Sequence, residues 1–187
     1  MEKKTIDIDI GSYNMGTSLN IVTLLNGVAQ GTDFTNRIGR TIVIHSVFIR
    51  GQILPTDAST LFNPARILFV YDMQTNGATP AATDILKQDA GLGQLNLNNR
   101  SRFKVFYDRT FPIGQITNTA TQTYAAGPNY AVFKKYKKCN FLTVFSGTGA
   151  TVASIQSGAI WMVTCGNGTA AECALLQASI RVRFLDA

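Results

Sequence analysis

Short segments in which apolar and polar residues alternate run through most of the chain. The clearest is 4–10, where three isoleucines alternate with Asp7 and Asp9. Because neighbouring side chains on a strand point to opposite sides, this pattern predicts a strand with one buried face. Further strands are expected at 40–54, 65–72, 102–111, 130–146 (one strand or two), 158–164 and 175–184.

The predicted strands are separated by long connections. These are residues 11–39, 73–99 and 112–129, and they carry much of the glycine and proline. Within the first, 20–25 fits a short helix or a strand, and the best helix candidate is 82–86. Parallel α/β folds need a helix at each crossover, so the pattern excludes them. We expect an all-β domain, and the long connections favour a jelly roll over an up-and-down barrel.

The alternation also predicts which side chains fill the space between the sheets. A bulge in a strand would invert the assignment beyond it, because one extra residue moves each later side chain to the opposite face. The expected core positions are Ile6, Ile8, Ile42, Ile44, Phe48, Ile67, Phe69, Val105, Tyr107, Ile160, Met162, Ile180 and Val182.

Composition agrees with one folded, mostly β domain. The 187 residues are 45% hydrophobic and 15% charged, which excludes an intrinsically disordered chain. Only Glu2 and Glu172 supply glutamate, a common residue of exposed helix faces. No apolar run approaches the roughly 20 residues of a membrane span, and the first residues do not resemble a signal peptide. We therefore expect one domain over residues 1–187 and no membrane partner.

The residues that commonly carry catalysis or bind metals are sparse. Cys139, Cys165 and Cys173 form no CxxC pair, and the only histidine, His45, lies inside an apolar run. This excludes the usual zinc spacings and favours buried cysteines in a reducing compartment. No nucleophile elbow or phosphate-binding glycine motif occurs. Asp72 and Asp108 end strands and are weak candidates for a glycosidase pair, so the prediction is a protein that is not an enzyme.

The basic residues are unevenly distributed. There are 17 Lys and Arg against 11 Asp and Glu, and the segment 100–138 holds eight of these cations with one acid, Asp108. Aromatic residues interleave with them, and positive charge beside aromatic rings is typical of nucleic-acid binding. The alternative is a sheet edge protected by lysines, with its aromatics in the core.

Several short segments, in this order and spacing, resemble a known family. They are Gly39-Arg40 before a strand ending in 49–53; 66–72 followed by Asn76-Gly77 and Pro80; 99–105 followed by Asp108; Phe133-Lys134-Lys135-Tyr136-Lys137-Lys138; Gly158-Ala159-Ile160-Trp161; and Arg181-Val182-Arg183-Phe184. From about residue 38 onward the chain is similar to capsid proteins of small circular single-stranded DNA viruses that encode a replication initiator, the circovirus-like and geminivirus-like group. Satellite RNA viruses of plants have similar single jelly rolls.

The resemblance implies a single eight-stranded viral jelly roll, built from two four-stranded antiparallel sheets. It further implies a virion protein that assembles inside the host cell, in the nucleus for some relatives. The shell would be a small icosahedral one, with about 60 copies in its smallest, T=1, form. The partners would be further copies of the chain, a genome expected to be single-stranded DNA, and a host receptor that the sequence does not identify. No cofactor is implied, although a structural divalent cation at a subunit interface stays open.

Family members carry a basic N-terminal arm that binds the genome, and here only Lys3 and Lys4 would represent it. The expectation is that the arm is absent or was removed before residue 1. Nucleic acid would then be bound without sequence preference by basic residues and one aromatic that line the interior. The candidates are Lys3, Lys4, Arg100, Arg102, Lys134, Lys135, Tyr136, Lys137, Lys138, Arg181 and Arg183.

The long connections are expected at subunit interfaces, since they hold apolar side chains that a monomer would expose. Examples are Leu24, Leu25, Leu92, Leu95, Leu97, Ile113 and Ile116. The alternative function is a jelly-roll module that binds carbohydrate or another ligand. Size-exclusion chromatography separates the two, because a closed shell elutes in the void volume and a module does not.

Overall fold

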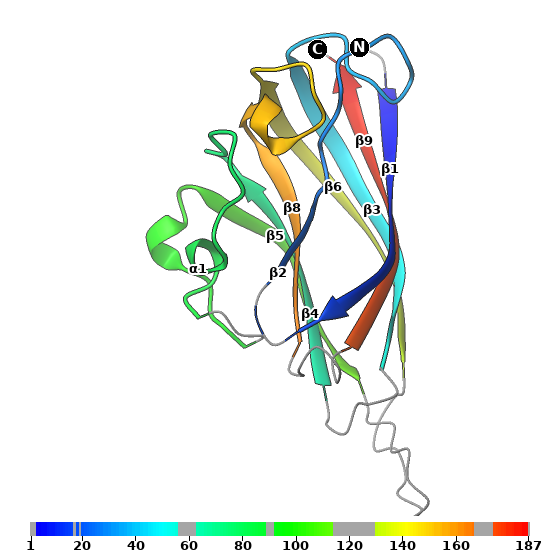
Figure 1. Ribbon diagram of the computed structural model, residues 1–187, viewed down its shortest axis with the longest axis vertical. Coiled ribbons are helices and arrows are strands. Elements are labelled where there is room, and N and C mark those ends of the chain that lie inside the picture. The colour runs from blue at the N-terminus through cyan, green and yellow to red at the C-terminus, as the bar shows by residue number, and fades with distance from the viewer. Residues whose placement is uncertain are drawn as a thin grey trace, which may run out of the picture.

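Two antiparallel sheets packed face to face form the body of the molecule (Figure 1). The structure is a computed structural model, and it describes residues 3–16, 18, 20–55, 63–88, 92–113, 130–166 and 174–186. The strands are β1 (Lys3–Met15), β2 (Asn20–Leu24), β3 (Thr41–Leu54), β4 (Asn63–Asp72), β5 (Phe103–Ile113), β6 (Ala131–Phe145), β7 (Ile155–Ser157), β8 (Ala159–Cys165) and β9 (Ala174–Asp186). The helices are α1 (Ala82–Ile85) and the 3₁₀ turns η1 (Leu97–Asn99) and η2 (Val152–Ser154).

The strand order is that of a jelly roll. One sheet runs β1-β9-β3-β6-β7 and the other β2-β8-β4-β5, so most hydrogen-bonded neighbours are distant in the sequence. All the strand pairs are antiparallel. This confirms the all-β jelly roll. The short strand β7 was not predicted; without it the described sheets have the expected four strands each.

The core lies between the sheets, and most of the predicted positions are in it. Along β9 every even residue from Ala174 to Phe184 is buried, as alternation requires. The predicted positions that are fully buried are Ile42, Ile44, Ile67, Phe69, Ile160, Met162, Ile180 and Val182. Tyr107 is 7% exposed, and Ile6, Ile8 and Val105 pack partly buried against the core.

The prediction for Phe48 was wrong because of a bulge. On β3, Ile44 pairs with Phe184 of β9, but Ser46 already pairs with Arg183, so His45 is an extra residue on β3. Beyond it the inward set changes from even to odd positions. Val47 is fully buried for this reason, and Phe48 lines a surface pocket on the outer face.

Two of the apolar residues expected at subunit interfaces are instead core residues. Leu25 and Ile113 are fully buried within the single chain. Leu24 is partly buried, and Ile116 lies outside the described residues. In contrast, Leu92 and Leu97 are 79% and 66% exposed, and both belong to the connection that carries α1.

A buried asparagine joins the two sheets where the chain passes from β7 to β8. Asn26 donates to the Gly158 carbonyl (2.7 Å) and Thr143 Oγ1 (2.8 Å), and its side-chain oxygen accepts from the Ile160 amide (2.8 Å). Gly158 has φ +83°, and a Cβ there would lie 2.1 Å from the Leu142 carbonyl oxygen. Only glycine fits this corner.

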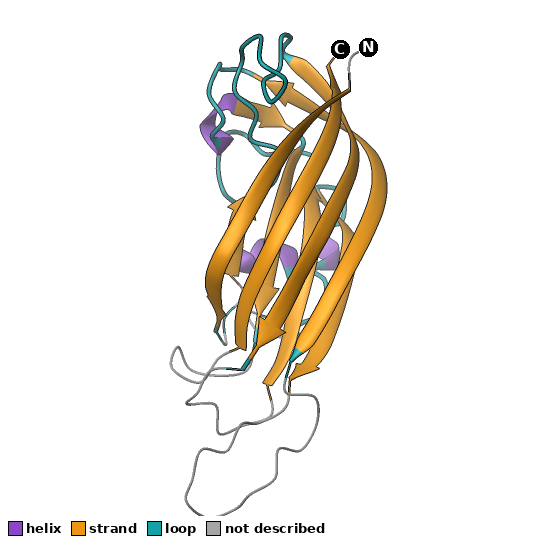
Figure 2. Cartoon of the chain, turned by 90° about the vertical axis from the view of Figure 1, so that its right-hand side faces the viewer, coloured by secondary structure: helices purple, strands orange, loops and turns teal. Residues whose placement is uncertain are grey.

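The outer faces of the two sheets differ. All seven residues of β8 are buried, because the connection with α1, including the buried Ile85 and Leu86, lies over the outside of the four-stranded sheet (Figure 1). Figure 2 shows the other sheet from outside: its long strands β1, β9, β3 and β6 lie open, and no described helix or loop crosses them. A single chain therefore leaves one broad sheet face uncovered.

Candidate nucleic-acid interface

The uncovered sheet face carries rows of side chains that run across four strands. One row is Thr5, Arg183, Ser46 and Lys138; the next is Asp7, Arg181, Phe48 and Tyr136; the third is Asp9, Ser179, Arg50 and Lys134. Lys3 pairs with Leu185 at the end of the same face. We call this surface the open face. It is defined by Lys3, Asp7, Asp9, Phe48, Arg50, Lys134, Tyr136, Lys138, Arg181 and Arg183.

Positive charge dominates the open face. It has six cations against two aspartates, and five of the cations are exposed, Arg183 being partly buried. Two aromatic side chains stand opposite one another in the central row, where Tyr136 is 50% exposed and Phe48 is partly buried. Cations around an accessible ring suit a charged backbone with stacked bases.

One ion pair partly neutralises this surface. Arg181 Nη2 and Nε donate to the two carboxylate oxygens of Asp7 at 2.6 and 2.7 Å. The hydrogen bonds from Arg181 lower the pKa of Asp7, and the charge of Arg183 adds to this. Asp7 is therefore ionised at neutral pH and neutralises Arg181. Most of the net positive charge of the open face comes from its other cations.

The lysines predicted on β6 divide between the two faces of that strand. Lys134, Tyr136 and Lys138 belong to the open face. Lys135 and Lys137 pair with Ile49 and Val47, which point into the sandwich, and they line a cleft between β6 and β5. The sequence prediction had placed all of them in one cluster.

Three further predicted residues lie away from the open face. Lys4 is 1% exposed; it donates to the Asn36 carbonyl at 3.0 Å and lies 3.5 Å from Asp186. Arg102 binds both carboxylate oxygens of Asp72, at 2.9 and 3.0 Å, and Arg100 caps the η1 turn at the four-stranded sheet. We therefore leave Lys4, Arg100 and Arg102 out of the candidate interface.

Sequence reasoning missed Arg50 as an interface residue. It follows the bulge at His45, so it shares the outward set with Phe48. The alternation along this strand could have indicated it, because beyond a bulge Arg50 and Phe48 lie on one face while Ile49 and Ile53 lie on the other.

The aspartates considered for catalysis are engaged in ion pairs. Asp72 is fully buried under Arg102, and Asp108 accepts from Arg66 Nε and Nη2 at 2.8 and 2.6 Å. Within the described residues there is no group of three or more His, Cys, Asp or Glu side chains that could hold a metal ion. In the same part of the chain, no helix is long and apolar enough to cross a membrane.

Two cysteines are described, and Cys139 is a free thiol. Cys165 is fully buried and Cys139 is partly buried, while Cys173 lies outside the described residues. Burial raises the pKa of the Cys139 thiol to about 11. At neutral pH this thiol is protonated and unreactive.

Comparison with known proteins decides which class of jelly roll this is. The family model for the satellite tobacco necrosis virus coat protein matches residues 1–187. The chain belongs to this family. It is also 26% identical, over 174 residues, to the coat protein of satellite tobacco necrosis virus 2, a match that covers 89% of this chain and 78% of that protein.

Membership in the coat protein family settles the general function. The chain is a structural, non-enzymatic viral capsid protein of the virion, and a ligand-binding module is not favoured. As a coat protein it assembles with itself into a capsid that encloses a viral genome. The match supports the expected similarity to satellite-virus capsid proteins. It does not support the expected link to single-stranded DNA viruses, because satellite tobacco necrosis virus has an RNA genome.

Proposed function

We propose that the open face lines the interior of a closed icosahedral shell and binds a single-stranded genome by its phosphates. The observation that carries this proposal is the uncovered, strongly basic outer face of β1, β9, β3 and β6. A capsid protein needs one surface that meets a polyanion, and the open face combines access with six cations. On the four-stranded sheet, α1 and its connection lie over the outer side, and every residue of β8 is buried.

The binding mode follows from the types of side chain. Lysine and arginine on a flat sheet neutralise phosphates but do not reach base edges in a groove, so they carry no sequence information. Tyr136 is exposed enough to stack on a base, and stacking tolerates every base. We therefore expect binding that is independent of sequence and strongly sensitive to salt.

We propose single-stranded RNA as the genome, in place of the single-stranded DNA expected from the sequence. The support is the family match, whose type virus has an RNA genome. Assembly in the nucleus loses its support together with the DNA assignment. The open face itself does not distinguish the two polymers, because it is expected to contact phosphates and base faces.

The charge of the chain limits how tightly the genome is held. Each chain carries +6, so a T=1 shell of about 60 copies sums to about +360. Encoding these 187 residues alone takes three nucleotides each, 561 in all. The charge of 60 such sequences thus covers no more than about two thirds of the phosphates, so other cations must neutralise the remainder.

Contacts between subunits are expected at exposed apolar side chains away from the open face. Leu92, Leu97, Phe34 and Ile38 are 56% to 79% exposed. They lie on two separate connections, before β3 and after β4. A closed shell needs at least two different self-contacts, and these two groups can supply them.

The test measures RNA affinity over a range of salt concentrations. Lys134→Gln with Lys138→Gln removes two cations from the open face, and should lower the slope of log K against log salt by about 1.4, at ~0.7 per phosphate contact. Lys87→Gln with Arg100→Gln removes the same charge elsewhere and should leave the slope unchanged. Equal slopes for the two double variants would contradict the proposal, as would strong preference for one RNA sequence.

A further inference from the structure

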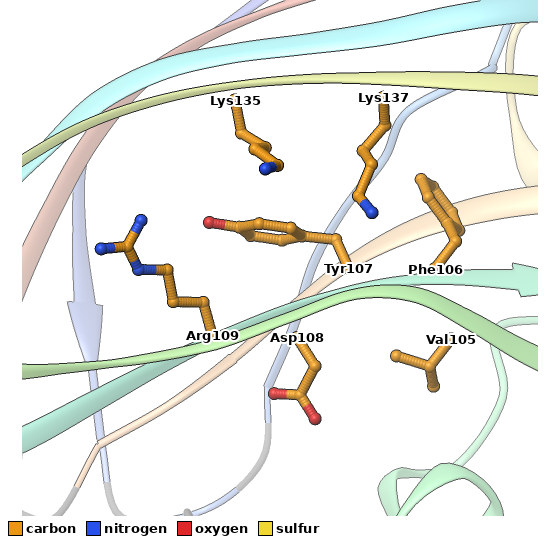
Figure 3. A pocket seen from close by; sticks show the side chains of 7 residues that line it. All are labelled: Val105, Phe106, Tyr107, Asp108, Arg109, Lys135 and Lys137. Carbon is orange, nitrogen blue, oxygen red and sulfur yellow. The ribbon is translucent and has the colours of Figure 1, made fainter.

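A second basic site lies between the sheets, at the open side of the sandwich where β5 and β6 face one another. We call it the β5–β6 cleft; it measures about 420 Å³ and is lined by Val105, Phe106, Tyr107, Asp108, Arg109, Lys135 and Lys137. Figure 3 shows the two lysines extending from β6 toward the Tyr107 ring, with Arg109 beside the ring on the β5 side.

The cations of the cleft lack a compensating acid. The only acidic lining residue is Asp108, whose carboxylate points away from the lysines in Figure 3 and binds Arg66 through both oxygens. Among the described residues, none forms an ion pair with Lys135, Lys137 or Arg109. Three like charges around one cleft repel each other, and an anion among them would remove that repulsion.

The cleft also holds a buried hydroxyl that lacks an acceptor. Tyr107 is 7% exposed, and no described residue accepts a hydrogen bond from its hydroxyl, although the Arg109 side chain interacts with the hydroxyl oxygen. Burial raises the pKa of this hydroxyl, with the charge of Arg109 in partial opposition, so it is protonated and able to donate. Buried polar groups in proteins are nearly always hydrogen-bonded, so an unpaired donor at the floor of a basic cleft indicates a missing acceptor.

Packed aromatic rings form the wall behind these groups. The ring of Phe69 lies 5.1 Å from that of Tyr107 and 5.8 Å from that of Phe106, which in turn contacts Phe141 at 5.1 Å. Arg109 is held 4.7 Å from the centre of the Phe111 ring. These contacts hold the Tyr107 ring and the Arg109 guanidinium in place, which lowers the entropic cost of binding a ligand there.

We propose that the β5–β6 cleft binds a phosphate group, with Lys135, Lys137 and Arg109 as counter-charges and the Tyr107 hydroxyl as a hydrogen-bond donor. A phosphate offers several acceptor oxygens to donors that converge from two strands. A lone carboxylate offers two and fills little of 420 Å³. The phosphate is either free, as the inorganic ion or a nucleotide, or part of a nucleic-acid backbone. This site is separate from the open face and does not depend on its role.

Calorimetric titration of the assembled protein at low salt tests the proposal with two probes. Inorganic phosphate represents a free phosphate. Uridylyl-uridine, which has one internal phosphodiester and no terminal phosphate, represents a backbone. Binding of inorganic phosphate alone assigns the site to free phosphate, and binding of both extends it to nucleic acid; either result supports the proposal.

Two double variants with the same change of charge locate the site. Lys135→Gln with Lys137→Gln should weaken phosphate binding by at least about tenfold. Lys87→Gln with Arg100→Gln makes the same charge change away from both the cleft and the open face, and should leave phosphate affinity within about twofold. A failure of the open-face proposal would appear as an unchanged salt slope of RNA binding in Lys134→Gln with Lys138→Gln, so the two proposals are separable.

The tyrosine variant tests the hydroxyl without risk to the fold. Tyr107→Phe keeps the ring and removes a hydroxyl that lacks an acceptor, so the protein should assemble normally while phosphate affinity falls about tenfold. The proposal is overturned by any of three results: no binding of either probe to the wild-type particle, unchanged phosphate affinity in Tyr107→Phe or in Lys135→Gln with Lys137→Gln, or acetate binding as tightly as phosphate. Acetate binding of that strength would indicate that a carboxylate from a neighbouring subunit, and not a phosphate, occupies the cleft.

Discussion

The two sheets of this coat protein are both antiparallel and share one core, but their outer faces differ in how far they are covered. The four-stranded sheet is covered by α1 and its connection, and every residue of β8 is buried. On β9 of the five-stranded sheet, buried residues alternate with partly or fully exposed ones, and nothing described lies over that sheet. The outer side of β8 is therefore covered, whereas the open face leaves its cations accessible.

Because of this difference, the covered sheet contributes mainly to the stability of the fold, and the open face is available for binding. A strand buried on both faces adds to the core but offers no surface to a ligand. A strand buried on one face anchors itself through that face and leaves the other free for recognition. Substitutions on the two sheets should therefore have different consequences, and three experiments test this.

The largest expected effect is a loss of folding stability when a core residue of the covered sheet is replaced. Phe69→Ala removes a fully buried ring that contacts Phe106 and Tyr107, and should lower the free energy of unfolding by about 3–5 kcal/mol. Tyr136→Ala, on the open face, should change it by less than about 1 kcal/mol. Urea denaturation followed by circular dichroism measures both, at one protein concentration because assembly adds to apparent stability. Similar losses in the two variants would contradict the comparison.

An intermediate effect is expected from the layer that covers the four-stranded sheet. Leu86 is fully buried although it lies on a connection outside the sheets. Leu86→Ala should cost about 2–3 kcal/mol, by lost burial and the cavity that remains. The same denaturation assay applies, with Leu97→Ala as the matched control, since Leu97 is 66% exposed on the same connection. A loss below about 1 kcal/mol for Leu86→Ala would mean that the layer covers the sheet without stabilising it.

The smallest effect on stability, with a gain in binding, is expected for Asp7→Asn. The pair with Arg181 is exposed on both sides and screened by solvent, so it adds little to stability, but removing it frees one cation on the open face and deletes an acid. RNA affinity should rise, and its salt dependence should steepen by about 0.7.

The same pair predicts how stability depends on pH. The folded-state pKa of Asp7 is lowered, so its contribution is present at neutral pH and disappears as the pH falls through that pKa. The stability difference between wild type and Asp7→Asn should therefore be constant above about pH 5 and shrink at lower pH. A difference that grows on acidification would rule out the ion pair as its origin.

Most of the fold could be predicted from alternation alone. The segment 4–10 and the strands near 65–72 and 175–184 correspond to β1, β4 and β9, with ends that extend by a few residues. The local alternation of apolar and polar residues was sufficient to locate these strands, because each of them has a buried face. Strand β7 was missed, since three residues hold too little alternation to detect.

The candidate interface could be predicted only in part. Alternation places Lys134 and Lys138 apart from Lys135 and Lys137 on β6, but a count of basic residues combines them. Arg50 was missed because the bulge at His45 depends on how β3 pairs with β9, which is a non-local property. Lys4 resembled an arm residue in sequence, and only the fold brings Asp186, from the other end of the chain, beside it.

Electron cryo-microscopy of particles purified with their genome tests whether the open face meets the nucleic acid. We expect closed shells in which the face of β1, β9, β3 and β6 lines the interior, with nucleic-acid density near Tyr136 and Arg50. The covered sheet should contribute no contact to that density. Shells in which the open face points outward, or lies sealed between subunits away from the nucleic acid, would contradict it.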